Sequence, residues 1–135
     1  MTVSERRPDV DIEDDIRQLI RSFAPLKASR DYFDFRSQNG VVKLWGNVRT
    51  TQARRVLLDN VPRVSGVMNC VADDLCADED LRFEVAQLLP PGVFANVHYG
   101  TVTISGKLPE GASVEAISDA VRHVSGVRRV VTDLK

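Results

Sequence analysis

The sequence predicts an α+β fold built from two tandem αββαβ units, each a small three-stranded mixed sheet with two helices on one face. One observation is a stretch that occurs twice, as NGVVKLWG at residues 39–46 and as YGTVTISG at residues 99–106. A second observation is RVSGV at residues 63–67, which returns as HVSGV at residues 123–127, again sixty positions later. Because both pairs share one offset without a gap, the chain reads as a tandem duplication.

The duplication divides the 135 residues into a flexible N-terminal segment (1–10), a first domain (11–75) and a second domain (76–135). A unit of about 60 residues buries only about 60% of the surface that its unfolded chain exposes, so it is marginal alone. We therefore expect the two units to pack against each other and to stabilise each other.

The first unit opens with a helix over residues 11–24, because its apolar residues recur at helical spacing. Acidic residues in its first turn interact favourably with the helix dipole. Pro25 ends this helix, and residues 27–30 form a loop.

A hairpin follows. Residues 32–37 alternate between apolar and polar side chains, which is typical of a half-buried strand. Asn39-Gly40 is a strong signal for a two-residue turn, since both positions need positive φ. The return strand covers residues 41–45 and ends at Gly46-Asn47. It points Val42 and Leu44 toward the core and the residues between them away from it.

Thr50 caps a second helix that runs to about residue 61, and residues 67–72 form the third strand. Residues 73–76 are a linker. The second unit repeats the order, with helices over 78–89 and 110–124, a hairpin that turns at Tyr99-Gly100, and a last strand over 127–132. In its first helix Leu81 and Leu88 face the core. Ile16 pairs with Leu81, which is an offset of sixty-five, so the first loop of the first unit has five extra residues.

Composition argues for an ordinary globular protein, with 43% hydrophobic and 27% charged residues. The net charge of −1 offers no global attraction to nucleic acid or to an anionic membrane, and no basic stripe carries interleaved aromatics. No apolar leader or membrane-spanning run is present, so we expect a cytoplasmic protein, or a periplasmic or envelope protein if a leader was removed. Cys70 and Cys76 are too far apart along an extended segment to form a local disulfide.

No catalytic constellation emerges. His98 and His123 occupy unrelated places in the repeat, and neither they nor the cysteines have the spacing of a zinc site. The acidic clusters at residues 11–15 and 78–80 lack the alternate oxygen ligands and central glycine of a calcium loop. We expect no enzyme activity, no cofactor and no metal.

The ordered set of an amphipathic helix, an alternating strand, NGVV-L-G, an alanine-containing helix and V-GV, found twice, resembles the BON domain of bacterial OsmY and nodulation-type proteins. This resemblance implies an αββαβ fold without catalysis. It also implies association with phospholipid, membranes or the cell envelope, or contacts between proteins. The family picture includes a potassium-responsive cytoplasmic relative.

Trp45 is the first candidate binding residue. It lies on the strand face opposite Val42 and Leu44, next to Val41 and Lys43. Its counterpart in the second unit is Ser105, so the fold does not require tryptophan at this position. A tryptophan on an open sheet face is typical of a contact with the other unit, with a second copy, or with a membrane.

Arg54, Arg55, Leu58 and Arg63 are a second candidate set, on or near one helix. Arg54 and Leu58 lie one turn apart and share an edge of the helix, while their counterparts in the second unit carry no charge. A basic edge tipped with leucine suits anionic phospholipid headgroups, although a solvated helix face would look the same.

Phe83 falls out of phase with the apolar face of its acidic helix, so we expect it to contact the first unit. Three functional hypotheses follow. The first is peripheral binding to anionic phospholipid or to a membrane-associated partner through the basic edge, with Trp45. The second is a protein-interaction or assembly module that buries Trp45 and Val41 in an interface, either with another protein or between copies of this chain. The third is an ion-responsive module.

Overall fold

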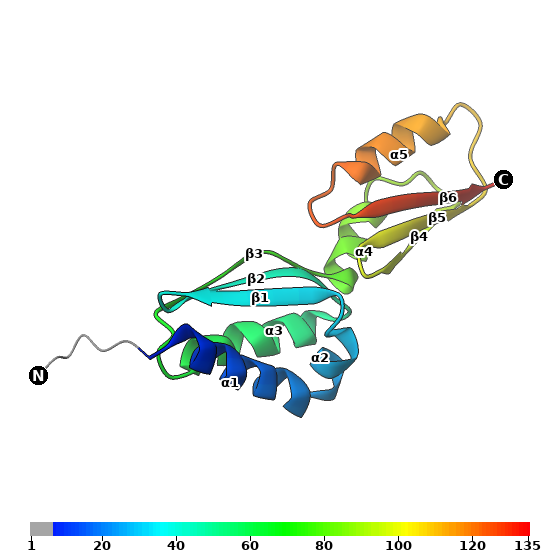
Figure 1. Ribbon diagram of the computed structural model, residues 1–135. Coiled ribbons are helices and arrows are strands. Elements are labelled where there is room, and N and C mark those ends of the chain that lie inside the picture. Colours follow the sequence, from blue (N-terminus) through cyan, green and yellow to red (C-terminus); the bar gives the residue numbers. More distant parts are fainter. Residues whose placement is uncertain (1–6) are drawn as a thin grey trace, which may run out of the picture.

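Two three-stranded sheets, each made of an antiparallel hairpin and a parallel third strand, form the framework of the computed structural model, which describes residues 7–135 (Figure 1). The predicted α+β class with two αββαβ units is confirmed. The first six residues of the predicted N-terminal segment lie outside the described part of the chain. The first unit contains α1 (Asp9–Ser22), α2 (Ala24–Ser29), β1 (Phe33–Gln38), β2 (Val41–Val48), α3 (Thr51–Asn60), the short 3-10 helix η1 (Val61–Arg63) and β3 (Asn69–Ala77).

The second unit consists of α4 (Asp78–Ala86), β4 (Val93–His98), β5 (Thr101–Gly106), α5 (Val114–Arg122) and β6 (Arg129–Leu134). Each sheet has its hairpin's second strand in the centre, in the orders β1-β2-β3 and β4-β5-β6. Each unit has its own apolar core under one face of its sheet.

The first core lies between the first sheet and the helices α1 and α3, which Figure 1 shows together on one side of the sheet. Val42 and Leu44 are fully buried, as their positions in the alternating strand predicted. The opposite face of this sheet carries no helix of its own unit. We call this surface, which bears Val41, Lys43 and Trp45, the open face.

Both hairpin turns have the backbone that the sequence predicted. Asn39 and Gly40 have φ angles of 55° and 83°, and Tyr99 and Gly100 have 47° and 81°. Asp9 accepts hydrogen bonds from the backbone N–H groups of Asn39 and Gly40 at 2.8 and 3.0 Å. A carboxylate of the preceding helix therefore holds the turn that the helix packs against.

The same arrangement in the second unit corrects the predicted alignment of the helices. Asp78 accepts hydrogen bonds from the N–H groups of Tyr99 and Gly100 at 2.7 and 3.1 Å, so it is the counterpart of Asp9, sixty-nine positions away. The predicted offset of sixty-five was wrong, because a shift of four residues is about one helical turn and leaves the same apolar face inward. The first unit therefore has nine extra residues before its hairpin, because α1 is five residues longer than α4 and the connection from α1 to β1 is four residues longer. That connection contains α2 instead of the predicted loop at 27–30.

Helix boundaries depart from the prediction where the chain bends. The first helix breaks at Phe23, whose φ and ψ of −119° and 111° are extended, and Pro25 lies in the first turn of α2. Proline suits that place because the first turn needs no N–H donor. In the second unit α4 ends at Ala86, so Leu88 is 45% exposed and not part of the core. Helix α5 begins only at Val114, after its cap Ser113.

Two strands are longer than predicted. β2 continues through Gly46 to Val48, because Gly46 adopts a φ of 108° and still pairs with Phe33. β3 runs to Ala77 and includes the residues predicted as a linker, with a bulge where it passes Leu44. Since α4 starts at Asp78, no residue separates the last strand of the first unit from the first helix of the second.

Candidate functional site

The open face of the first sheet is the candidate site, and the strand registers set its side chains in rows. Trp45 on the central strand lies opposite Asp34 of β1 and Asp74 of β3. Two residues along the strand, Lys43 lies opposite Arg36. Trp45 is 37% exposed although it is the largest side chain on this face. The face is therefore an accessible aromatic position surrounded by charge.

The second unit turns this face into a groove. Residues 125–128, which join α5 to β6, stand beside the open face and together with all three strands of the first sheet line a cavity of about 1180 Å³. Trp45, Val41, Lys43 and Arg128 are among its lining residues. We call this cavity the groove. Because residues of both units line the groove, its shape depends on how the units are joined.

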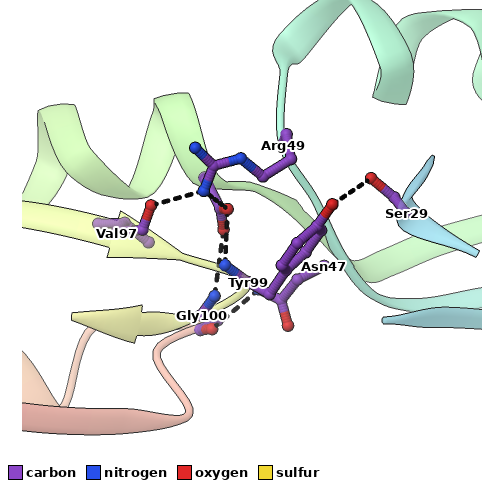
Figure 2. Close-up of polar contacts among 8 residues, drawn as sticks. Ser29, Asn47, Arg49, Val97, Tyr99 and Gly100 are labelled. Carbon is purple, nitrogen blue, oxygen red and sulfur yellow. Dashed lines mark hydrogen bonds and ion pairs between the residues drawn. The ribbon is translucent and has the colours of Figure 1, made fainter. Parts of the chain in front are cut away.

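Tyr99 makes the central contact of that joint, which Figure 2 shows. Its ring stacks on Tyr32 with the centroids 3.6 Å apart and the planes 6° from parallel. Its hydroxyl lies 3.1 Å from Ser29 Oγ, on α2, the helix that the second unit lacks (Figure 2). Nearby, Asn47 Nδ2 donates to the carbonyl oxygen of Gly126 at 3.4 Å. The extra helix of the first unit thus provides a partner for the turn of the second.

Arg49 and Asp78 add an ionic contact to the joint. The Asp78 carboxylate, only 4% exposed, lies 3.1 Å from the Arg49 guanidinium. Arg49 also donates to the carbonyl oxygen of Val97 at 3.0 Å, and its guanidinium lies 5.6 Å from the centre of the Tyr99 ring (Figure 2). One carboxylate therefore both fixes the second hairpin turn and ties it to the first unit.

Replacing Tyr99 with asparagine, the residue at the corresponding turn position 39, is expected to loosen the joint without disturbing the turn. Asparagine tolerates positive φ, but the stacked ring and the hydroxyl contact are lost. Together these contacts contribute about 2 kcal/mol, so the detached arrangement rises roughly thirtyfold in population. Backbone ¹⁵N relaxation is expected to show different rotational correlation times for the two units. Tyr99→Phe, which keeps the stack, is the control; one shared correlation time in Tyr99→Asn would contradict the assignment.

The predicted site residues divide into two groups. Trp45, Val41 and Lys43 lie together in the groove. Of the basic set, Arg54 donates to the carbonyl oxygens of Leu75 and Ala72 at 2.8 and 3.3 Å, and Leu58 packs against the first core.

Only Arg55 and Arg63 of the basic set are exposed. These four residues therefore do not form one continuous basic edge. Phe83 is 69% exposed, so it is not buried against the first unit, and the aromatic contact between the units is made by Tyr99 instead. Sequence reasoning missed Tyr99. The available signal was a bulky residue at a turn position that requires positive φ, where the first unit has asparagine.

The cysteines and the possible metal ligands within residues 7–135 do not form a further site. Cys70 and Cys76 are free, and partial burial raises the pKa of the Cys76 thiol in the groove. A raised pKa lowers the thiolate fraction and so disfavours nucleophilic chemistry. In this part of the chain no group of three or more histidine, cysteine, aspartate or glutamate side chains could hold a metal ion. None of its helices combines the length and the apolar character needed to cross a membrane.

Comparison with known proteins places the second unit in a family. The family model of the BON domain matches residues 77–135, which contain α4 to β6. The predicted family is thereby confirmed for the second unit, while a second BON domain over residues 11–75 stays a prediction. No curated protein matches the chain.

Among solved structures, the chain is similar to CdsD, a structural protein of the type III secretion system of Chlamydia trachomatis. Its C-terminal domain matches with a TM-score of 0.72 and 13% identity, over 95% of this chain and 66% of that one. A second CdsD structure matches with a TM-score of 0.72 and 12% identity, over 92% of this chain and 61% of that one. The chain thus spans less than two thirds of the CdsD chains' length, and at these identities the likeness concerns the fold.

Proposed function

We propose that the chain is a non-catalytic protein-binding module that takes its partner in the groove on the open face of the first sheet. The observation that carries this proposal is Trp45, an exposed tryptophan on the floor of a groove built jointly by the two units. Tryptophan is among the residues that contribute most to binding when a partner covers them. The second unit has Ser105 at the same position, so folding does not explain the tryptophan.

Two comparisons support an interaction role. The second unit matches the BON domain, and CdsD, which shares the fold, is itself a structural protein of a secretion system. We further propose that the first unit is a divergent BON-type domain with α2 inserted. This is supported by the shared αββαβ order and by the matching contacts of Asp9 and Asp78 with the two hairpin turns.

The test is photo-crosslinking in the cells from which the protein comes. A benzophenone amino acid placed at Val41, which is 40% exposed on the open face, is expected to give a discrete adduct with a partner protein. The matched control places it at Thr101, the same position of the second sheet. Adducts of equal kind and yield at both positions, or none at Val41, would contradict the proposal.

Trp45→Ser, which installs the residue of the second unit, is expected to weaken binding of the crosslinked partner about tenfold or more, because a central tryptophan typically contributes 1–2 kcal/mol or more. The measurement is a titration of purified partner against both proteins, and unchanged circular dichroism is the check that the fold is kept. Equal affinities for the wild type and the variant would exclude Trp45 from the binding surface.

Anionic phospholipid is the competing partner, with Arg55 and Arg63 as the contacts. Sedimentation with vesicles of phosphatidylglycerol and of phosphatidylcholine, at low and physiological salt, separates it from a protein partner. Salt-sensitive binding to the anionic vesicles that Arg55→Glu with Arg63→Glu abolishes, and Trp45→Ser leaves intact, would overturn the groove proposal in favour of a lipid surface.

A further inference from the structure

The open face carries a charge pattern that specifies its partner more closely. In one row across the three strands, Trp45 has a carboxylate on each side, Asp34 on β1 and Asp74 on β3. In the neighbouring row, Lys43 lies opposite Arg36. All five side chains line the groove. An acidic row with an aromatic centre thus lies next to a basic row on a single surface.

The row with Trp45 is suited to a cation. Directly opposite side chains on neighbouring strands have their Cβ atoms about 4.5–5.5 Å apart. One oxygen of Asp34 accepts from the Phe35 N–H at 2.8 Å, which leaves its other oxygen and the Asp74 carboxylate within reach of a group placed over the indole ring. The face of a tryptophan ring attracts cations more strongly than that of any other side chain. An arginine or lysine side chain of a partner would meet the ring and two carboxylates together.

The basic row is suited to a carboxylate. Lys43 Nζ lies 3.9 Å from Asp74 Oδ2, at the limit of an ion pair, and both side chains are more than half exposed. Such an exposed pair contributes little, so Lys43 is available to a partner. Arg36, on the neighbouring strand, adds a second positive charge to the same row.

The spacing of the rows fits an extended peptide. The rows are two residues apart along β2, which is about 6.7 Å, and side chains two residues apart on an extended chain have the same separation on one face. This inference rests on the proposed function of the groove as a protein-binding site. We propose that the groove binds an extended segment of a partner protein with an acidic and a basic residue at positions i and i+2. The basic residue lies over Trp45, and the acidic residue lies between Arg36 and Lys43.

A second copy of the chain fits this surface less well. The face of three short strands offers roughly 300 Å², while a stable interface needs about 800 Å² from each partner. The second sheet provides an internal comparison, because its corresponding rows are Phe94, Ser105 and Asp133, then Asn96, Thr103 and Val131. These rows contain one charge, so the pattern belongs to the first sheet and not to the fold.

The test uses synthetic threonine-rich nonapeptides without tryptophan, titrated into the full chain. Trp45 is the only tryptophan, so its fluorescence reports the groove alone. The matched peptide has Glu-Thr-Arg at its centre, the first control has Glu and Arg adjacent so that they point to opposite faces, and the second has alanine for arginine. The matched peptide is expected to bind about tenfold tighter than either control.

Charge variants of the protein sharpen the test. Asp34→Asn with Asp74→Asn is expected to remove the preference for the peptide with arginine, whereas Asp133→Asn on the second sheet leaves it unchanged. Arg36→Glu with Lys43→Glu is expected to switch the preference to a peptide with Arg-Thr-Arg. Equal affinity of the matched and adjacent-charge peptides would overturn the charge pattern as the basis of recognition.

The peptide titration and the crosslinking test of the proposed function can fail independently of each other. If a partner crosslinks at Val41 but the matched and control peptides bind with equal affinity, the groove remains the docking surface. The charge pattern is then refuted as the basis of recognition. A concentration-dependent rise in mass that Trp45→Ser abolishes would overturn the peptide in favour of a second copy.

Discussion

Replacing Asp78 with alanine is expected to lower the free energy of unfolding by about 3 kcal/mol, because it leaves buried polar groups without partners. The side chain is 4% exposed and accepts from the N–H groups of Tyr99 and Gly100 while it pairs with Arg49. Alanine removes all three contacts at once, in the turn and in the joint. Chemical denaturation followed by circular dichroism is the measurement.

Asp9→Ala is the matched variant, since Asp9 holds the first hairpin turn in the same way but is less buried. We expect a smaller loss for Asp9→Ala, about 1–2 kcal/mol, because Asp9 is partly exposed and water can replace part of its contacts with Ser37, Asn39 and Gly40. Equal losses for the two variants would contradict the special role of Asp78 in the joint. A loss below about 1 kcal/mol for Asp78→Ala would refute the account of its buried hydrogen bonds.

Replacing Gly106 with alanine is expected to destabilise the protein by about 3 kcal/mol or more, because the new Cβ atom clashes and the backbone conformation is unfavourable for alanine. Gly106 has a φ of 113°, and a Cβ atom there would overlap the carbonyl oxygen of Gly92. That oxygen belongs to the backbone and accepts from the Lys107 N–H, so it has little freedom to move. Thermal unfolding of the variant is the measurement.

Gly111→Ala is the control for this prediction. Gly111 also has a positive φ, 86°, but a Cβ atom there would meet nothing within 4 Å. Its loss is expected to be about 1 kcal/mol, the contribution of the left-handed backbone alone. If Gly106→Ala destabilises the protein no more than Gly111→Ala does, the close approach to Gly92 is not what requires glycine.

Much of the fold could be predicted because it depends on local patterns. Asn39-Gly40 indicated a turn with positive φ at both positions, and Val42 and Leu44 alternated onto the buried face. Thr50 caps α3 as expected, with its hydroxyl accepting from the Ala53 N–H at 3.0 Å. Each of these features depends on residues within a few positions of one another, so a single stretch of sequence contains the necessary information.

The candidate site was predictable in part. The face of β2 that carries Trp45, Val41 and Lys43 followed from the alternation of its side chains. The four residues of the predicted basic set do not form one surface. Arg54 instead donates hydrogen bonds to carbonyl oxygens of β3, a strand about twenty residues away in the chain. Which carbonyls an arginine can reach depends on the bulge in β3, and no local pattern predicted that bulge.

The sequence by itself determined two αββαβ units, their hairpin turns and the faces of their strands, because periodic burial and turn chemistry act locally. The sequence did not determine how α1 aligns with α4, because a shift of one helical turn preserves the apolar face. Only the contacts of Asp9 and Asp78 distinguish the two possible alignments. Tertiary structure alone decided the joint and the groove. Both depend on contacts such as Tyr32 with Tyr99 and Asn47 with Gly126, which join residues far apart in the chain and become neighbours only when the two units meet.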